Sequence, residues 1–233
     1  MFKGVLFDFD NTLVDSAKVL PKAQWKAAEL IANYIGRPQH VAEVFSTIKR
    51  VERTLELFGV YDRDRYWHHV LAELGAENAV DERTIRRWTE AYWSEYIKHE
   101  LFLDTITVLE SLKHRCKLGI VSNTDGLPDM KRKRLEKVGI LSYFDAVVIA
   151  GEEGVDPKPS PKPFLTAVKV LGLKRDECLM VGDHPVNDVV GAKSAGLHTA
   201  LLDPTGEKVY TVKPDYVVSR LLEVVDIVLG KRF

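Results

Sequence analysis

The sequence predicts an α/β protein built on a doubly wound, mostly parallel sheet, with an α-helical domain inserted after the first strand. Three observations lead to this prediction. Short apolar runs recur along the chain, segments with helical periodicity separate the later runs, and residues 16–103 carry helical patterns without a convincing strand. We therefore expect a sheet domain made of residues 1–15 and 104–233 and a helical domain made of residues 16–103.

The predicted strands are short and apolar. The first, within residues 2–9, ends at carboxylates, as expected of a buried strand that delivers polar groups to its carboxyl end. Four similar runs and a short edge strand follow at residues 117–122, 146–150, 177–182, 198–202 and 215–218.

Helical patterns separate the later strands. Leu135 and Val138 lie near one helical face and precede Gly139, a residue typical of helix C-termini. Strands that alternate with helices favour a parallel sheet covered on both faces. Ligands of such sheets bind outside the carboxyl ends of the strands.

The inserted segment, residues 16–103, reads as consecutive helices with turn signals at residues 36–38, Gly59 and Gly75. It holds all four Trp residues and five of the eight Tyr residues, a concentration that needs a reason. Aromatic packing between short helices is the simplest explanation, and a pocket wall is the alternative.

The composition is that of an ordinary globular protein, with 233 residues of which 45% are hydrophobic and 29% charged. A formal net charge of -1 provides no global field for nucleic acid or an anionic membrane, so we expect neither partner. Cys116 and Cys178 are too few for a disulfide framework. The absence of a membrane-spanning run or a signal-peptide pattern predicts a cytoplasmic protein. Two Gln and five Asn among many Lys and Glu fit a protein of a hot environment.

The first chemical motif is Asp8-Phe9-Asp10-Asn11-Thr12, at the end of the first predicted strand. Residues two apart in a strand share a face, so both carboxylates reach one place. Their repulsion is relieved by a divalent cation or by a proton on one of them, which indicates a metal site or acid/base chemistry. A simple turn with a capping role is the alternative.

A second pair of carboxylates follows a later strand. Asp183 comes directly after the apolar run that ends at Gly182, and Asp188 lies five residues further on. Asp183 can complete an oxygen site with Asp8. Asp188 can cap the next helix, orient Asp183 or coordinate metal itself.

Two further polar clusters also follow strands. Ser122 and Asn123 end the run that starts at residue 117, and Lys158 lies in a proline-rich segment before a helix. A strand-end hydroxyl with neighbouring backbone N–H groups can bind phosphate oxygens, and a lysine supplies positive charge. Each signal is weak alone, but all four clusters fall at the ends of strands in one predicted sheet.

Together these motifs resemble the haloacid dehalogenase superfamily, specifically its phosphatase-like members with an α-helical cap. The resemblance covers nearly the whole chain, and its motifs are Asp8–Thr12, Ser122, Lys158–Phe164 and Gly182–Asp188. Asn11 stands where Gly is common in the family. The resemblance implies a Rossmann-like core with the first strand in the centre, and makes residues 16–103 the cap.

The resemblance implies a phosphomonoester hydrolase that uses Mg²⁺. Asp8 would be the nucleophile and form an aspartyl-phosphate, while Asp10 would protonate the leaving oxygen and then activate water. Thr12 would orient Asp10. Asp8, the backbone carbonyl of Asp10 and Asp183 would hold the metal ion.

The same resemblance implies a phosphate-binding set. Ser122, the backbone N–H of Asn123 and Lys158 would contact the phosphate oxygens. Lys158 would also position Asp8.

Three other functions compete with hydrolysis of a phosphate ester. A phosphomutase shares the complete phosphotransfer site. A 2-haloacid dehalogenase needs neither Asp10 nor the metal, so Asp10 and Asp183 favour phosphate chemistry. A non-catalytic binding module would have lost a nucleophile or a metal ligand, and none is lost. The basic run Lys131–Arg134 is interpreted as a solvated helix face rather than a nucleic-acid site.

The sequence does not identify the ester, because the core motifs contact only phosphate. A closed helical cap leaves room for a small substrate, so we expect a small phosphorylated metabolite of the sugar or triose phosphate type. Arg50 and Arg53 are candidate specificity residues, with a solvated helix position as the alternative for each. The sequence predicts no particular oligomeric state.

Overall fold

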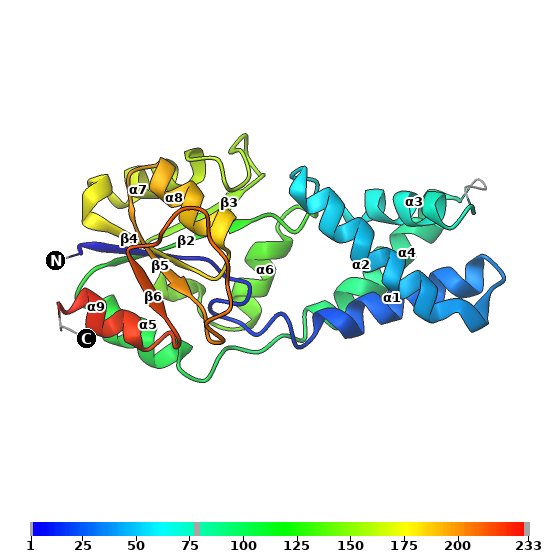
Figure 1. Cartoon of the computed structure of the whole chain (residues 1–233), viewed down its shortest axis with the longest axis horizontal. Helices are drawn as coiled ribbons and strands as arrows, with labels where there is room; N and C mark the ends of the chain where they lie inside the picture. Colours follow the sequence, from blue (N-terminus) through cyan, green and yellow to red (C-terminus); the bar gives the residue numbers. More distant parts are fainter. Residues whose placement is uncertain (1, 77–79, 231–233) are drawn as a thin grey trace. The chain divides into compact units, whose positions relative to one another are not determined.

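The computed structural model describes residues 2–76 and 80–230, which form two compact units (Figure 1). The sheet unit comprises Met1–Asp15, Glu100–Thr124 and Pro128–Phe233. The helical unit comprises Ser16–His99 and Asp125–Leu127.

The sheet unit contains a six-stranded sheet in the order β3-β2-β1-β4-β5-β6, and every neighbouring pair is parallel. This confirms the predicted fold class and the central place of the first strand. The short edge strand is also present. The strands are β1 (Gly4–Phe7), β2 (Lys117–Asn123), β3 (Ala146–Ala150), β4 (Cys178–Gly182), β5 (His198–Leu202) and β6 (Tyr216–Val218).

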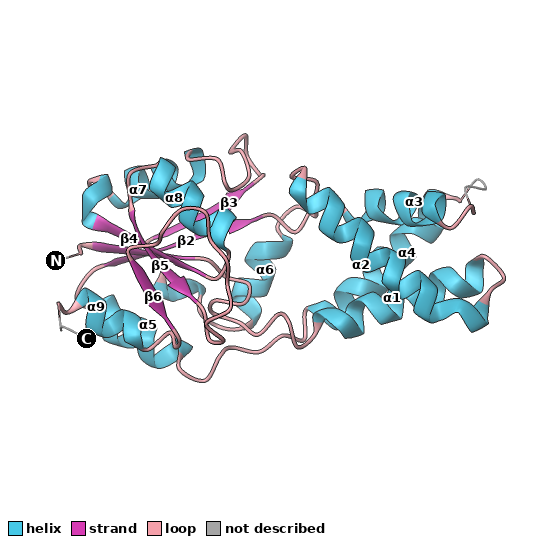
Figure 2. Ribbon diagram, in the orientation of Figure 1, coloured by secondary structure: helices cyan, strands magenta, loops and turns pink. Residues whose placement is uncertain are grey.

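Helices cover both faces of this sheet (Figure 2). Side chains alternate along β1, so Val5 and Phe7 join the apolar cluster of one face while Leu6 joins the cluster of the other. Burial on both faces explains why the central strands are continuously apolar. The first cluster includes residues of α5 (Thr105–Lys113), α6 (Met130–Lys137) and α9 (Glu223–Val228), and the second includes residues of α7 (Lys162–Leu171) and α8 (Gly191–Ser194).

The helical unit consists, within the described residues, of four α-helices without a strand. Helix α1 packs against α2 and α4, and α3 packs against the same two helices. Carboxylates of Asp62 and Asp81 cap the N-termini of α3 and α4. Gly36, Gly59 and Gly75 have positive φ just after α1, α2 and α3, as the turn signals predict. The bounds are α1 (Leu20–Tyr34), α2 (Val41–Leu57), α3 (Arg63–Glu73) and α4 (Glu82–Tyr96).

Aromatic side chains fill the core of the helical unit. Trp67 and Tyr92 are fully buried with their ring centroids 6.0 Å apart, and Trp67 Nε1 donates to Thr89 Oγ1 over 2.7 Å. Trp88 and Trp93 are also buried. The packing explanation is therefore confirmed for these three Trp residues, whereas the fourth, at position 25, remains 42% exposed.

The boundaries of the two units differ from the predicted ranges in two places. Residues 100–103 belong to the sheet unit, because the Asp15 N–H donates to the Glu100 carbonyl over 2.9 Å and Val14 bridges to Leu101. Asp125–Leu127 group with the helical unit. A Cβ at Gly126 would lie 2.2 Å from the carbonyl oxygen of residue 61, so only glycine permits this approach.

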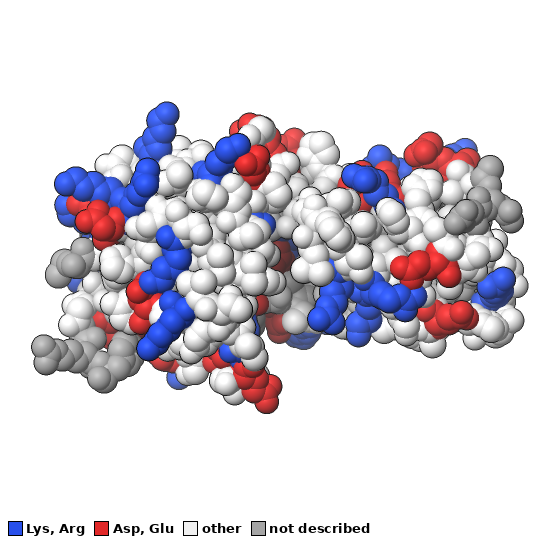
Figure 3. Space-filling model, turned by 45° about the horizontal axis from the view of Figure 1, so that its top comes forward, with Lys and Arg blue, Asp and Glu red and all other residues white. Residues whose placement is uncertain are grey.

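The surface carries charges of both signs. Lys, Arg, Asp and Glu side chains are interspersed on the face seen in Figure 3, as expected from a formal net charge of -1. Cys116 and Cys178 are both free thiols. Across residues 2–76 and 80–230, the helices fall short of the length and apolar character that a membrane span requires.

Candidate active site

Asp8 and Lys158 form the centre of the candidate site. Asp8 directly follows β1, and Lys158 lies in the loop between β3 and α7. Lys158 Nζ donates to Asp8 Oδ1 over 2.8 Å, to Asp188 Oδ1 over 2.7 Å and to the Val121 carbonyl over 3.0 Å. These contacts use all three donors of the ammonium group. Lys158 therefore acts here on two carboxylates, and it must give up one contact before it can donate to phosphate.

The charges of this group depend on one another. Burial disfavours the charged form of Lys158, but the neighbouring carboxylates of Asp188 and Asp8 raise its pKa. Burial raises the pKa of the Asp8 carboxyl, and Lys158 opposes that rise. Burying any one of these charges without a partner would cost folding free energy. The lysine and the two carboxylates therefore stabilise one another in the site.

Three carboxylates offer ligand atoms for a metal ion. Oxygens of Asp8, Asp183 and Asp188 lie within 4.8 Å of one another. An all-oxygen, anionic donor set is the type that Mg²⁺ prefers, so these residues fit the implied metal. Asp188 thus stands beside the predicted ligands Asp8 and Asp183, while the Asp10 side chain points elsewhere.

Gly182 allows Asp188 to approach the strand end. A Cβ at Gly182 would lie 2.2 Å from Asp188 Oδ2, which leaves no space for any other residue. Asp188 Oδ2 accepts the His184 N–H over 2.9 Å, and its Oδ1 accepts from Lys158. The Gly-Asp sequence at the end of β4 therefore positions two carboxylates at once.

Asp183 has a lysine partner that the sequence analysis missed. Lys208 Nζ donates to Asp183 Oδ2 over 3.1 Å and also to the Asp183 carbonyl. Burial, followed by the charges of Asp188 and Asp8, raises the pKa of Asp183 to about 7, although Lys208 acts against this. Asp203, at the end of β5, shapes the loop by accepting the Gly206 and Lys208 backbone N–H groups over 2.9 and 3.0 Å.

Asp10 lies against helix α6 rather than in the carboxylate cluster. Arg134 donates to both of its carboxylate oxygens, and Lys131 donates to Oδ2. Burial alone would raise the pKa of Asp10, but these two cations hold it well below its usual range. Lys131 and Arg134 are 3% and 0% exposed, so the interpretation of residues 131–134 as a solvated face is wrong for both. They share a helix face because they are three residues apart.

The other predicted residues of the sheet unit lie at the same sheet edge. Ser122 and Asn123 end β2, beside β1, and Ser122 is buried. Asn123 Oδ1 accepts the Lys158 backbone N–H over 2.8 Å, which ties β2 to the lysine loop. The expected contact between Thr12 and Asp10 is not made: the Thr12 hydroxyl is buried without a hydrogen-bond partner among the described residues.

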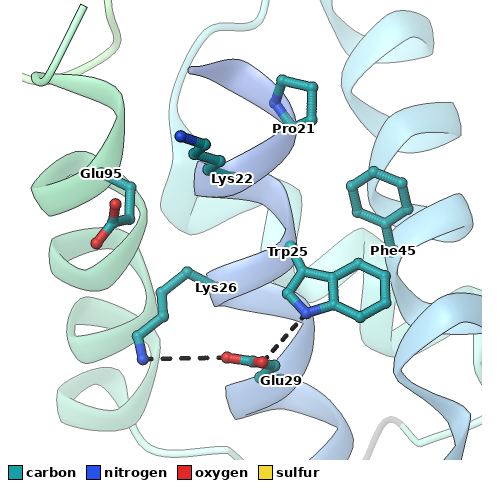
Figure 4. Close-up of a pocket in the computed structure, with 7 residues that line it drawn as sticks. All are labelled: Pro21, Lys22, Trp25, Lys26, Glu29, Phe45 and Glu95. Atoms are coloured by element: carbon teal, nitrogen blue, oxygen red, sulfur yellow. Dashed lines mark hydrogen bonds and ion pairs between the residues drawn. The ribbon is translucent and has the colours of Figure 1, made fainter. Parts of the chain in front are cut away.

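The two candidate specificity residues lie on α2 of the helical unit. Arg50 Nε donates to Glu73 Oε2 over 2.9 Å, and Arg53 is exposed. The exposed Trp25 lines a separate surface pocket of about 370 Å³ between helices, together with Phe45 (Figure 4). Its indole N–H donates to Glu29 over 3.1 Å. The pocket-wall alternative thus describes Trp25.

Sequence comparison identifies the family. Residues 2–196 match the pattern of the haloacid dehalogenase-like hydrolases. The chain belongs to this family. The match spans parts of both units and contains all four motifs, so the enzyme is a hydrolase of this family.

Several phosphatases are similar in sequence to this haloacid dehalogenase-like hydrolase. N-acylneuraminate-9-phosphatase of Mus musculus is 28% identical over 232 residues, which cover 95% of this chain and 91% of the relative. Glyceraldehyde 3-phosphate phosphatase of Methanopyrus kandleri is 29% identical, with coverage of 98% and 97%. A HAD phosphatase from Thermococcus onnurineus, known from its crystal structure, is 28% identical in sequence. Its fold matches this one with a TM-score of 0.69, and the match covers 100% of both chains.

Proposed function

We propose that this hydrolase is a Mg²⁺-dependent phosphomonoesterase, which acts on a small phosphorylated metabolite of the sugar or triose phosphate type through an aspartyl-phosphate. The observation that carries the proposal is the buried contact of 2.8 Å between Asp8 and Lys158, with Asp183 and Asp188 beside it. Relatives named as phosphatases, similar over nearly the whole chain, support a phosphatase over a dehalogenase.

In the first displacement, an Asp8 carboxylate oxygen attacks phosphorus and forms the aspartyl-phosphate bond as the ester P–O bond breaks. Asp10 first takes up a proton from solvent, against the two cations that favour its carboxylate form, and then donates it to the leaving oxygen, so the product leaves as an alcohol. Lys158 holds Asp8 at the strand end and balances part of the charge around it. Position and charge balance are the main protein contributions to such a transfer.

In the second displacement, water attacks phosphorus and the bond to Asp8 breaks. Asp10, now a carboxylate, accepts a proton from that water. Its ion pairs with Arg134 and Lys131 favour the carboxylate form that this step requires. Asp8 is regenerated and inorganic phosphate is released.

The remaining groups bind phosphate and metal. Ser122 and the Asn123 backbone N–H contact the phosphate oxygens whose charge must be stabilised in the transition state. Asp8, Asp183 and the Asp10 backbone carbonyl would hold Mg²⁺, which would supply positive charge that shields the nucleophile from the phosphate. Asp188 orients this set through Lys158.

We assign the selection of the leaving group to the helical unit, as the cap of the enzyme. The sheet unit supplies groups for the phosphate, and the family pattern includes the inserted helices. A small metabolite is the substrate class that a closing cap favours. The enzyme acts in the cytoplasm.

The test is phosphate release by the purified enzyme. Hydrolysis of p-nitrophenyl phosphate should require Mg²⁺ and stop after chelation with EDTA, and a panel of phosphorylated metabolites should contain a better substrate. Chloride release from 2-chloropropionate serves as the matched test for dehalogenation. Activity that survives rigorous chelation would overturn the metal assignment, and chloride release above phosphate release would overturn the phosphatase assignment.

A further inference from the structure

Two cationic side chains of one helix converge on the Asp10 carboxylate. Arg134 is bidentate: its two terminal nitrogens donate to different oxygens of Asp10, with Nη1 at 3.2 Å from Oδ2. Lys131 donates to the same Oδ2. A planar guanidinium that contacts both oxygens fixes the orientation of a carboxylate as well as its position.

Lys131 and Arg134 are both buried where they contact Asp10. Leu135 of α6 belongs to the same apolar cluster as Phe9, the residue between Asp8 and Asp10. The Arg134 guanidinium and the Lys131 ammonium lie 5.0 and 5.7 Å from the centre of the Phe9 ring. Burial of an arginine at 0% exposure is costly unless an anion accompanies it. Asp10 is that anion, so helix, ring and carboxylate form one packed arrangement.

The hydroxyl that the family resemblance assigns to this task is not engaged. Thr12 Oγ1 is buried and has no hydrogen-bond partner within the described part of the chain. The contacts that orient the Asp10 carboxylate in this structure therefore include α6 and exclude Thr12.

We propose that Arg134, supported by Lys131, is a positioning residue that holds Asp10 in place for proton transfer to and from the ester and water oxygens. The inference rests on the proposed function, in which Asp10 exchanges that proton. Arg134 reaches the reacting groups through its two hydrogen bonds to Asp10, so we expect its effect to pass through Asp10.

This role has a specific kinetic consequence. Glycerol 2-phosphate leaves as an alkoxide that needs a proton, whereas p-nitrophenolate departs readily without one. A misplaced Asp10 should therefore slow the first displacement much more for glycerol 2-phosphate than for p-nitrophenyl phosphate, because a positioned proton donor contributes about 10²-fold or more. The second displacement is common to both substrates and also uses Asp10, so the comparison is made on kcat/KM, which covers the steps up to release of the leaving group.

The experiment is a double-mutant cycle between Arg134→Met and Asp10→Asn, with both substrates and saturating Mg²⁺. We expect Arg134→Met to lower kcat/KM for glycerol 2-phosphate by about 10- to 100-fold and for p-nitrophenyl phosphate by less than about threefold. In the Asp10→Asn background, Arg134→Met should cause no further loss, because residues that act through one another are not additive. Arg134→Lys should restore part of the activity.

Arg132→Met is the matched control, since Arg132 is exposed on the same helix. Thermal melts identify a variant that fails to fold, and Lys131→Met then repeats the cycle with the second cation. Equal losses of kcat/KM on both substrates, a higher kcat/KM, or an undiminished effect in the Asp10→Asn background would each overturn the positioning role. A wild-type enzyme inactive on both esters, or a fully active Asp10→Asn variant, would instead overturn the proposed function.

Discussion

The ammonium group of Lys208 donates a hydrogen bond to the Asp183 carboxylate, with 3.1 Å between Nζ and Oδ2. The backbone of Lys208 is itself anchored, because its N–H donates to Asp203 Oδ2 over 3.0 Å. Only the flexible side chain must move when a metal ion takes the same oxygen. The Lys208 side chain is therefore a cation anchored beside the candidate metal ligands, and we expect it to compete with a metal ion for Asp183.

Lys208→Met should tighten Mg²⁺ binding. A partly exposed ion pair contributes about 0.2–1 kcal/mol, so loss of the competing ammonium corresponds to a decrease in Kd of up to about fivefold. Isothermal titration of the metal-free protein with MgCl₂ measures this without reference to turnover. Lys213→Met, an exposed lysine in the same loop, is the control. Unchanged or weaker binding in Lys208→Met would show that the lysine supports the site instead.

Mg²⁺ affinity should rise with pH until about 7. Burial and the charges of Asp188 and Asp8 raise the pKa of Asp183 to about 7, so below that pH the ion must displace a proton from this carboxyl. The association constant should rise about tenfold per pH unit and level off above the pKa, because one proton is released. Titrations with MgCl₂ from about pH 5.5 to about pH 8.5, on both sides of this pKa, measure how the association constant changes with pH.

The same pKa predicts a stability effect without metal. An Asp whose pKa is raised on folding binds a proton more tightly in the folded state, so its contribution to stability is present at low pH and is lost as pH rises to about 7. Asp183→Asn should remove this loss and raise the melting temperature of the EDTA-treated protein at pH 8, about one unit above the pKa. A variant that melts below wild type there would contradict the assignment.

Asp8 and Asp10 should fail in different ways when changed. Asp8→Asn removes the proposed nucleophile and should abolish both turnover and the trapped phosphoenzyme. Asp10→Asn keeps the nucleophile, so turnover should fall by at least ~10²-fold while attack at phosphorus is still possible. Rapid quench with labelled substrate separates the two variants. Normal turnover by Asp8→Asn, or label on another residue, would contradict the nucleophile assignment.

The strand-end residues were predictable because their signal is local. An apolar run that stops at a carboxylate, as at Phe7 and Asp8 or at Gly182 and Asp183, predicts both the strand and the position of the carboxylate at its end. Parallel neighbours then bring the ends together, which is why Lys158 meets Asp8 across 150 positions of sequence.

The partners of those carboxylates depend on tertiary structure. Residues 131–134 are all basic, so their composition does not show which two side chains turn inward, and Arg132 and Lys133 remain exposed. Leu135 packs in the same apolar cluster as Phe9, and Lys131 and Arg134 are buried beside it. Their spacing of three residues beside an apolar position was the available signal. Lys208 lies in a loop without periodicity, so its contact with Asp183 had no signal of this kind.

Gly182→Ala should damage the site through Asp188. The added Cβ would lie 2.2 Å from Oδ2 and 2.3 Å from Cγ, so the carboxylate must move away from Lys158. Overpacking of this type costs about 1–3 kcal/mol, which should lower the melting temperature and turnover together. The double variant Gly182→Ala/Asp188→Gly removes the overlap but also the Asp188 contact with Lys158, so it should not regain activity. If the single variant melts like wild type, the close approach of Asp188 is not needed.

Substitutions on α2 test whether the helical unit selects the ester. Arg53 is exposed, whereas the Arg50 guanidinium is paired with Glu73 across α2 and α3. We expect Arg53→Ala to lower kcat/KM for the best metabolite at least about tenfold more than for p-nitrophenyl phosphate, because only the metabolite has a leaving group to recognise. Arg50→Ala should show the same selectivity if the Arg50 guanidinium leaves Glu73 and contacts the substrate during turnover.

Glu73→Ala is the control for Arg50, since it breaks the same ion pair and keeps the arginine. A pair this exposed contributes about 0.2–1 kcal/mol, so Glu73→Ala should change stability slightly and both substrates equally. If Arg50→Ala behaves like Glu73→Ala, the arginine serves only to join α2 to α3. Equal effects of Arg53→Ala on both substrates would remove that residue from specificity. Efficient hydrolysis of a folded phosphoprotein would contradict the proposed small-metabolite substrate, because the cap closure that we propose would exclude a surface of that size.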